Sequence, residues 1–214
     1  MKKLGEVANA SNGKMTLAAH LCGKRVDEVL SGDDKFLSTL PHMGFRRIQI
    51  NATAINKCTV DLNQSVQSLY ALIRRFPQLE FIIQKNGETK PLWNSLIVQS
   101  HEGENGSDPN VRNNPKNIAL LMDESKGTGT LPQSFEAVPT VCEIGYAGGI
   151  SPDNIKDVLM KILESNPCQS FWIDMESSLR SMKNSHDVFD IDKCIACIEA
   201  VCELKLFSHP SYLQ

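Results

Sequence analysis

The sequence contains no apolar segment long enough to cross a membrane. A spanning helix needs roughly 18 or more consecutive apolar residues, and no run among the 214 residues approaches that length. The first 14 residues also lack the apolar stretch of a secretory signal, although Lys2 and Lys3 follow the initial methionine. The sequence therefore predicts a cytoplasmic protein with no membrane partner.

Excess positive charge and glycine-rich nucleotide motifs are missing as well. The chain has 22 Lys and Arg against 25 Asp and Glu, a net charge of -3, whereas nucleic-acid-binding domains are usually basic. No GxGxxG follows the first apolar segment, and no GxxxxGK precedes a Ser or Thr. These absences count against a nucleic-acid partner and against dinucleotide or P-loop nucleotide binding, and we expect no cofactor.

The cysteines show neither a disulfide framework nor a zinc-binding pattern. There are seven, an odd number, and they are scattered along the chain. Cys194 and Cys197 form one CxxC, but it lies inside an apolar helical pattern without a second CxxC or a histidine pair. We therefore expect reduced thiols and no metal site.

Six short segments, most of them apolar throughout, have the pattern of buried strands. They cover residues 15–22, 46–51, 79–84, 119–122, 141–146 and 171–174. Helical patterns alternate with them, which predicts a parallel α/β sheet covered on both faces. A barrel and a doubly wound sheet both satisfy this pattern, and the length fits one domain spanning residues 1–214.

Helix signals between these segments differ in strength. Residues 24–32 and 61–76 carry amphipathic patterns, and Ser151 followed by Pro152 marks a helix start. Asp192 is the expected cap of a final helix, whose predicted inward residues are Ile195, Ile198, Val201 and Cys202. The remaining segments predict a helix or strand at 91–100, a polar loop at 101–117 and a polar linker at 181–188.

Polar and glycine residues follow the last three predicted strands. Asp123 ends the segment Ala119–Met122, and Gly127 and Gly129 allow the next loop to approach a ligand closely. Gly148 and Gly149 end the following strand directly before a helix start. Ser177 and Ser178 then follow the last strand, so the last two loops together predict a phosphate site built from backbone N–H groups and a helix N-terminus.

Residues 117–200 resemble phosphoribosylanthranilate isomerase, a TIM-barrel enzyme of tryptophan biosynthesis. The segments LLMDESKGTGT, IGYAGGISPDNI and FWIDMESSLR are similar to three motifs of that family, in the same order and at fitting separations. The resemblance implies a TIM-barrel-like fold, in which six strands instead of eight would make an incomplete or N-terminally shortened barrel. It also implies a small phosphorylated substrate and an Amadori-type conversion of an aminoaldose into an aminoketose.

Site residues follow from the same resemblance. The family's phosphate contacts correspond to Gly148, Gly149, Ser177 and Ser178, its general acid to Asp123 and its general base, a cysteine followed by glycine, to Cys22. Where the family has Gly-Val-Glu, this chain has Ser178-Leu179-Arg180, and an arginine there would add a charge-assisted phosphate contact.

Two other classes of function stay open at this point. Asp174 and Glu176 alternate onto one face and could join Asp123 in binding a divalent cation, as in a metal-dependent aldolase or isomerase acting on a sugar phosphate. A barrel without a base would instead be a non-catalytic, ligand-binding relative. The sequence leaves homo-oligomerisation open.

Overall fold

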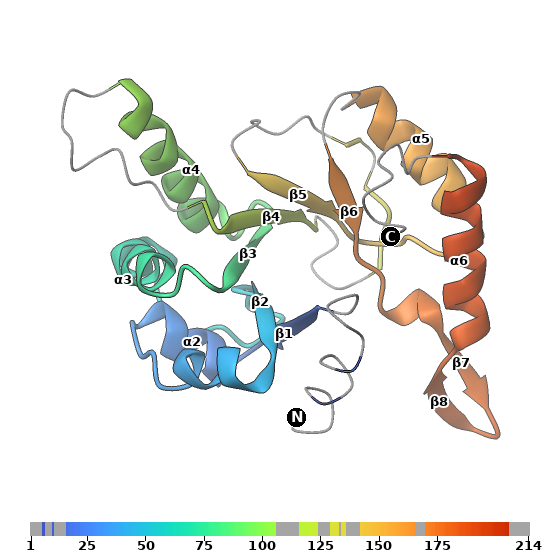
Figure 1. The fold of residues 1–214 in the computed structure, drawn as a ribbon, viewed down its shortest axis with the longest axis horizontal. Helices are drawn as coiled ribbons and strands as arrows, with labels where there is room; N and C mark the ends of the chain where they lie inside the picture. The colour runs from blue at the N-terminus through green and yellow to red at the C-terminus, as the bar shows by residue number, and fades with distance from the viewer. Residues whose placement is uncertain are drawn as a thin grey trace. The chain divides into compact units, whose positions relative to one another are not determined.

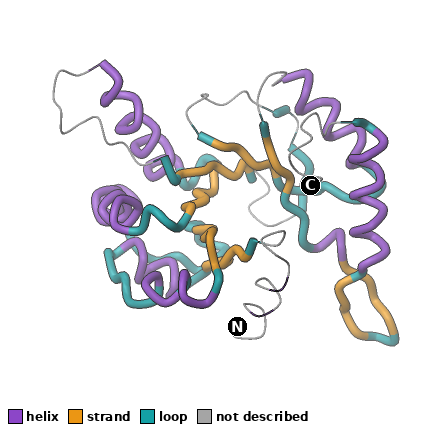
Figure 2. Tube along the Cα trace, viewed as in Figure 1, coloured by secondary structure: helices purple, strands orange, loops and turns teal. Residues whose placement is uncertain are grey.

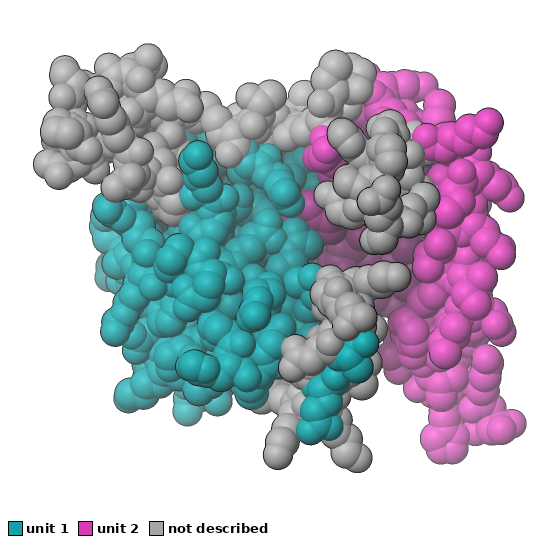
Figure 3. All heavy atoms as spheres, viewed as in Figure 1, with its two compact units in different colours: residues 1–122, 139–145 teal, residues 123–138, 146–214 magenta. Residues whose placement is uncertain are grey.

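The computed structural model of the chain forms two compact units, coloured separately in Figure 3. Unit 1 holds residues 1–122 and 139–145, and unit 2 holds residues 123–138 and 146–214. The structure describes residues 6, 10, 16–105, 116–123, 129–132, 134–135, 142–165 and 170–205. In these ranges no helix combines the length and the apolar character that a membrane span requires. The single-domain organisation stays a prediction.

All six predicted strands are confirmed. They are β1 (Leu17–Leu21), β2 (Phe45–Ile50), β3 (Glu80–Lys85), β4 (Ile118–Met122), β5 (Glu143–Tyr146) and β6 (Phe171–Ile173), shown in orange in Figure 2. Each strand pairs with the next one along the chain, and the pairs from β1 to β4 are parallel. A doubly wound sheet would reverse its order at a switch point, whereas a barrel keeps it sequential. The described chain is thus an incomplete TIM-barrel-like α/β fold with six of the usual eight strands.

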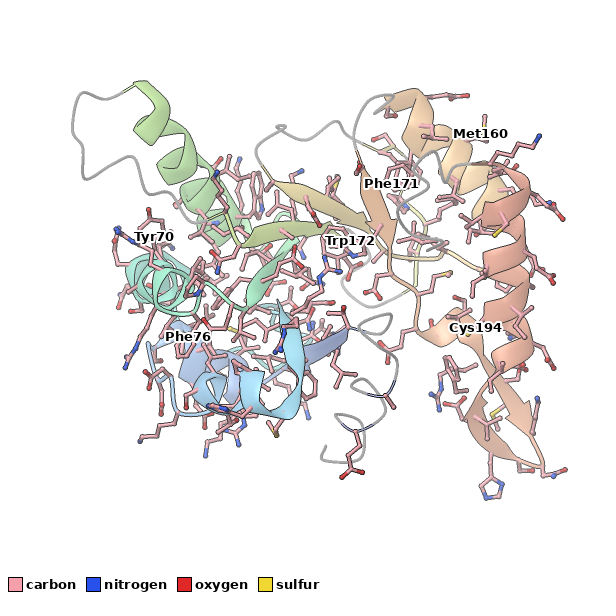
Figure 4. All side chains as sticks on the ribbon, viewed as in Figure 1. Tyr70, Phe76, Met160, Phe171, Trp172 and Cys194 are labelled. Carbon is pink, nitrogen blue, oxygen red and sulfur yellow. The ribbon has the colours of Figure 1, made fainter. Side chains whose placement is uncertain are left out.

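Three helices follow the strands of unit 1. They are α2 (Lys24–Leu30), α3 (Leu62–Arg75) and α4 (Lys90–Asn105), with short 3-10 turns at Leu37–Thr39 and Pro41–Met43. The Asp61 side chain caps α3 by accepting from Asn63 N–H, and Phe76, before Pro77, ends it (Figure 4). Residues 91–100, for which the sequence predicted either a helix or a strand, belong to the helix α4. Residues 101–105 continue this helix, so the prediction of a polar loop at 101–117 is wrong for them.

The strands of unit 1 present two chemically different faces. Ile48, Ile83 and Leu120 belong to the face that is buried, and Figure 1 shows α2, α3 and α4 along one side of β1–β4. The cross-strand register puts Arg47 beside Glu80 and His20 beside Gln49 on the opposite face. Arg47 and Glu80 form an ion pair there. The second face of this sheet is polar near β1 and β2.

The elements of unit 2 include a hairpin that the sequence patterns did not predict. The helices are α5 (Ile155–Ser165) and α6 (Ile191–Glu203), and between β6 and α6 lie a 3-10 turn (η3, Ser177–Leu179), β7 (Arg180–Lys183) and β8 (His186–Phe189). The prediction of a linker at 181–188 is therefore wrong. Asn184 and Ser185 both have positive φ, at 51° and 63°, as a two-residue type I′ hairpin turn requires.

The final helix also differs from its prediction in cap and orientation. Asp190, not Asp192, caps it by accepting from Asp192 N–H. Cys197 and Ala200 are buried, whereas Ile195 and Ile198 are exposed, so the predicted inward face is wrong. Cys202 is exposed as well, and Val201 is half-buried.

Three aromatic rings of unit 2 form a cluster around Tyr146. The buried Tyr146 ring meets Phe135 and Phe171 edge to face, with centroid separations of 5.5 and 5.9 Å. Figure 4 shows Phe171 and its neighbour Trp172 on β6. Burial raises the pKa of the Tyr146 hydroxyl to about 12 because the phenolate would lose its hydration.

Unit 2 should therefore lose stability in alkali. The unfolded tyrosine releases its proton near its ordinary pKa of 10, while the folded one holds it to about 12. The unfolded state thus binds fewer protons between these values, and the free energy of unfolding falls as the pH rises from 10 to 12. Urea denaturation at stepped pH measures this slope. A Tyr146→Phe variant should show a smaller slope, and an unchanged slope would contradict the assignment to Tyr146.

Candidate functional site

Buried polar side chains lie at the carboxyl ends of β2 and β3 in unit 1. Nine polar or charged residues are buried in the described chain, and two of them, Ser65 and Asp190, belong to helix starts. Six of the other seven end or follow β2 and β3 in unit 1, namely Asn51, Thr53, Gln84, Lys85, Asn86 and Thr89, and Asp123 follows β4 at the start of unit 2. Burying polar groups costs free energy unless they are hydrogen-bonded, and the carboxyl edge of a β/α sheet is where ligands bind. This edge is the candidate functional site.

Cys22 lies at this edge, directly after β1, and its exposed thiol is held between two amides. Its Sγ donates to Asn56 Oδ1 at 3.6 Å and accepts from Asn51 Nδ2 at 3.8 Å. Asn51 is fixed in turn, because it donates to the Leu21 carbonyl and accepts from Gln49. The thiol thus has a defined position and remains open to solvent.

The backbone conformation at residue 23 explains why a glycine follows Cys22. The φ of Gly23 is +54°, a conformation that residues with a Cβ rarely adopt, and its N–H donates to the Asn56 carbonyl at 2.7 Å. The local backbone structure therefore favours glycine after Cys22, independently of the family resemblance that pointed to this Cys-Gly pair.

The loop after β3 contains functional candidates that the sequence patterns missed. Asn86 Oδ1 accepts from the N–H groups of Glu88 and Thr89, at 3.0 and 3.1 Å, and closes the turn before α4. The Lys85 ammonium lies 4.9 Å from the centroid of the Trp93 ring, over its face. Glu88 accepts from Ala54 N–H and so ties this loop to the one after β2. The signal available in the sequence was a lysine directly after the apolar run of a predicted strand, followed by the turn residues Asn86 and Gly87.

The glycine turn after β5 is held by protein groups on two sides. Gly148 and Gly149 have φ values of +96° and +64°. Asn154 donates to the Gly149 carbonyl and accepts from Ser151 N–H, both at 2.8 Å. A Cβ on Gly149 would lie 2.5 Å from Leu131 N, so the loop after β4 reaches the glycine turn. Gly127 lies outside the described residues.

The predicted helix start at Ser151 lies close to the observed one. The Ser151 carbonyl accepts the first i to i−4 bond from Ile155 N–H at 3.0 Å, and α5 is regular from Ile155 onward. The glycine turn therefore leads directly into the N-terminal turn of α5.

The two predicted phosphate loops meet in unit 2. Ser178 Oγ donates to the Ile150 carbonyl, which joins η3 to the residue after the glycine turn. Ser177 is exposed beside it. Arg180 has a different position: its guanidinium donates to the Asp187 side chain at 2.8 Å and to the Asp187 carbonyl at 3.1 Å, across the hairpin.

Asp123, the predicted acid, directly follows β4 and is 8% exposed. Asp174 N–H donates to the Tyr146 carbonyl at 2.9 Å, which fixes the end of β6, and Glu176 is exposed. Among the residues that the structure describes, which include these three carboxylates, no group of three or more His, Cys, Asp or Glu side chains could hold a metal ion.

No protein-family model, curated protein or solved structure matches the chain. The fold assignment therefore rests on strand order, and any assignment of function rests on the side chains at the carboxyl edge.

Proposed function

We propose that this chain is a phosphoribosylanthranilate isomerase-like protein that binds a phosphorylated sugar. The phosphate is held by the turn Gly148–Gly149 and by Ser177 and Ser178. The observation that carries the proposal is the bond from Ser178 to the Ile150 carbonyl, because it brings these two loops together in front of α5. Backbone N–H groups in a glycine turn and a helix N-terminus are the donors that phosphate prefers.

The proposed reaction is an Amadori rearrangement with Asp123 as the general acid and Cys22 as the general base. Asp123 gives its proton to the ring oxygen as the C1–O bond breaks, and Cys22 as thiolate then removes the proton from C2. The resulting enolamine takes up a proton at C1 and releases the proton of its C2 hydroxyl, which gives the aminoketose. The buried position of Asp123 and the fixed, exposed thiol of Cys22 support these roles.

Phosphate binding is tested by a pair of serine substitutions at opposite ends of β6. Millimolar phosphate or a phosphosugar should raise the melting temperature of the wild type, since a ligand that binds only the folded state stabilises it. Ser177→Asp places a carboxylate among the proposed phosphate contacts and should remove the shift. Ser170→Asp adds the same charge at the amino end of the strand, where residue 170 is exposed, and should keep it.

The outcomes separate the proposal from its rivals. A wild type that shows no shift, or equal shifts in both variants, would rule out the proposed phosphate site. Stabilisation that depends on Mg²⁺ or Mn²⁺ and is abolished by EDTA would instead favour the metal-dependent aldolase or isomerase. A phosphate shift without turnover of phosphoribosylanthranilate would identify a non-catalytic sugar-phosphate-binding relative.

A further inference from the structure

The helix α6 has apolar residues on two opposite sides. Its inner side carries the buried residues Cys197 and Ala200, and Cys197 Sγ lies 4.0 Å from Met175 Sδ. Its outer side carries a second apolar row, which we call the α6 seam: Ile191, Ile195, Ile198 and Cys202. At about 100° per residue, the two rows point in nearly opposite directions. The three isoleucines are 64%, 47% and 61% exposed.

The spacing in the α6 seam is that of a helix-pairing surface. Its members follow one another at steps of four, three and four residues, which is the a/d spacing of a coiled coil. The outer side of a helix in a β/α fold normally faces water and is polar. An outward a/d row is therefore not explained by packing within unit 2.

The exposed apolar residues are concentrated in this part of the chain. Seven large hydrophobic side chains are exposed in the described residues, and five of them lie between 182 and 198. Besides the three isoleucines these are Met182 and Phe189, which the β7–β8 register places on one face of the hairpin. Scattered apolar residues need no explanation, but a concentration of this kind marks an interaction surface.

Charges beside the α6 seam indicate the partner. Asp192, Glu199 and Glu203 form an acidic row along one edge, and Cys194 and Val201 line the other edge without charge. Glu203 pairs with Lys156 of α5, whereas Asp192 and Glu199 are exposed and form no ion pair within the described chain. Asp192 and Glu199 are thus available to a partner.

A second copy of this chain fits the charges poorly. In an antiparallel pair of two α6 seams, the acidic row of one copy would face the acidic row of the other. In a parallel pair, the acidic row of each copy would face the uncharged edge of the other, formed by Cys194 and Val201, so its charges would find no basic partner. A membrane surface fits poorly as well, because helices that lie in it are rich in Lys and Arg. A partner helix with an apolar row and a basic edge would pack its apolar residues on the α6 seam and pair its positive charges with the acidic row.

We infer that the α6 seam binds an amphipathic α-helix of another protein, with apolar residues at a/d spacing and Lys or Arg along the edge that meets Asp192 and Glu199. This interaction is separate from the proposed sugar-phosphate site. It uses the outer face of α6 and the acidic edge beside it.

The probe is a synthetic three-heptad peptide with Leu at a and d and Lys at e and g, alongside a matched peptide with Glu in place of Lys. The Lys peptide should bind the full chain, measured by fluorescence anisotropy, and its affinity should fall with salt because the contacts include exposed charges. It should slow alkylation of Cys202 several-fold, read by mass spectrometry. Alkylation of Cys22, the exposed thiol of unit 1, is the internal reference.

The matched variants are Ile198→Gln in the seam and Ile55→Gln outside it. These isoleucines are 61% and 60% exposed, so both variants should keep the wild-type melting temperature. Ile198→Gln should weaken peptide binding by about tenfold or more, since it removes a side chain buried by the partner. Ile55→Gln should leave binding unchanged.

Three results would overturn the inference. They are absent or equal binding of the Lys and Glu peptides, unaltered Cys202 alkylation, and equal affinity of the two variants. A dimer of the wild-type chain that Ile198→Gln dissociates would assign the α6 seam to a second copy instead.

Discussion

A Gly149→Ala variant should lose about 2 to 5 kcal/mol of its free energy of unfolding. The left-handed backbone, with φ at +64°, costs about 1 to 2 kcal/mol for a residue with a Cβ. The added Cβ would also lie 2.5 Å from Leu131 N and 2.8 Å from the Gly129 carbonyl oxygen. Because both are backbone atoms, relief requires a shift of the chain, and overpacking adds about 1 to 3 kcal/mol. Urea denaturation followed by circular dichroism measures the loss.

Gly129→Ala separates the two contributions. Gly129 also has a positive φ, +73°, but a Cβ there would have no heavy atom within 4 Å. This variant should lose only the conformational part, about 1 to 2 kcal/mol. Equal losses in the two variants would show that the close approach to Leu131 does not matter for stability.

An Asp123→Asn variant should lose about 10² to 10⁴ of the proposed isomerase activity in kcat/KM. The amide has nearly the same shape as the carboxyl group but cannot deliver the proton that opens the sugar ring, and general acid catalysis contributes on that order. Turnover of phosphoribosylanthranilate measures the loss. The variant should still bind phosphate, because the proposed phosphate contacts lie after β5 and β6.

Asp157→Asn is the matched control for this prediction. Asp157 is an exposed carboxylate on α5, so its replacement should leave kcat/KM unchanged. Full activity in Asp123→Asn would remove this residue from the mechanism. A parallel loss of activity and of phosphate stabilisation would mean that Asp123 supports the site's structure and does not transfer a proton.

The fold alone does not select among functions, because β/α barrels host many unrelated chemistries. The stronger argument lies in the position of particular side chains. In unit 1, six buried polar residues end or follow β2 and β3. In unit 2, the bond from Ser178 to Ile150 joins the two loops after β5 and β6. In each unit these residues follow the carboxyl ends of strands, where β/α folds bind their ligands.

Local patterns in the sequence determined where the six strands of the sheet and most of the helices form. The short apolar runs at 81–83 and 118–122, between helical patterns, predicted buried strands of a parallel sheet, and the spacing of apolar residues in α3 predicted a helix. Short-range chemistry also placed Asp123 and the glycine turn at strand ends. These signals depend on neighbours within a few residues, and one sequence is enough to read them.

Tertiary structure decided what depends on distant neighbours. The helix α6 has two apolar rows, and the helical periodicity of its sequence does not show which of them is buried. Only tertiary contacts, such as that of Cys197 with Met175, determine which row faces inward. The turn Asn184-Ser185 lacks the glycine that usually marks a type I′ hairpin, so β7 and β8 gave no clear local signal. The close approach of Leu131 to Gly149 joins residues 18 apart in the chain. Local periodicity records none of these contacts, because each arises only when separate elements pack together.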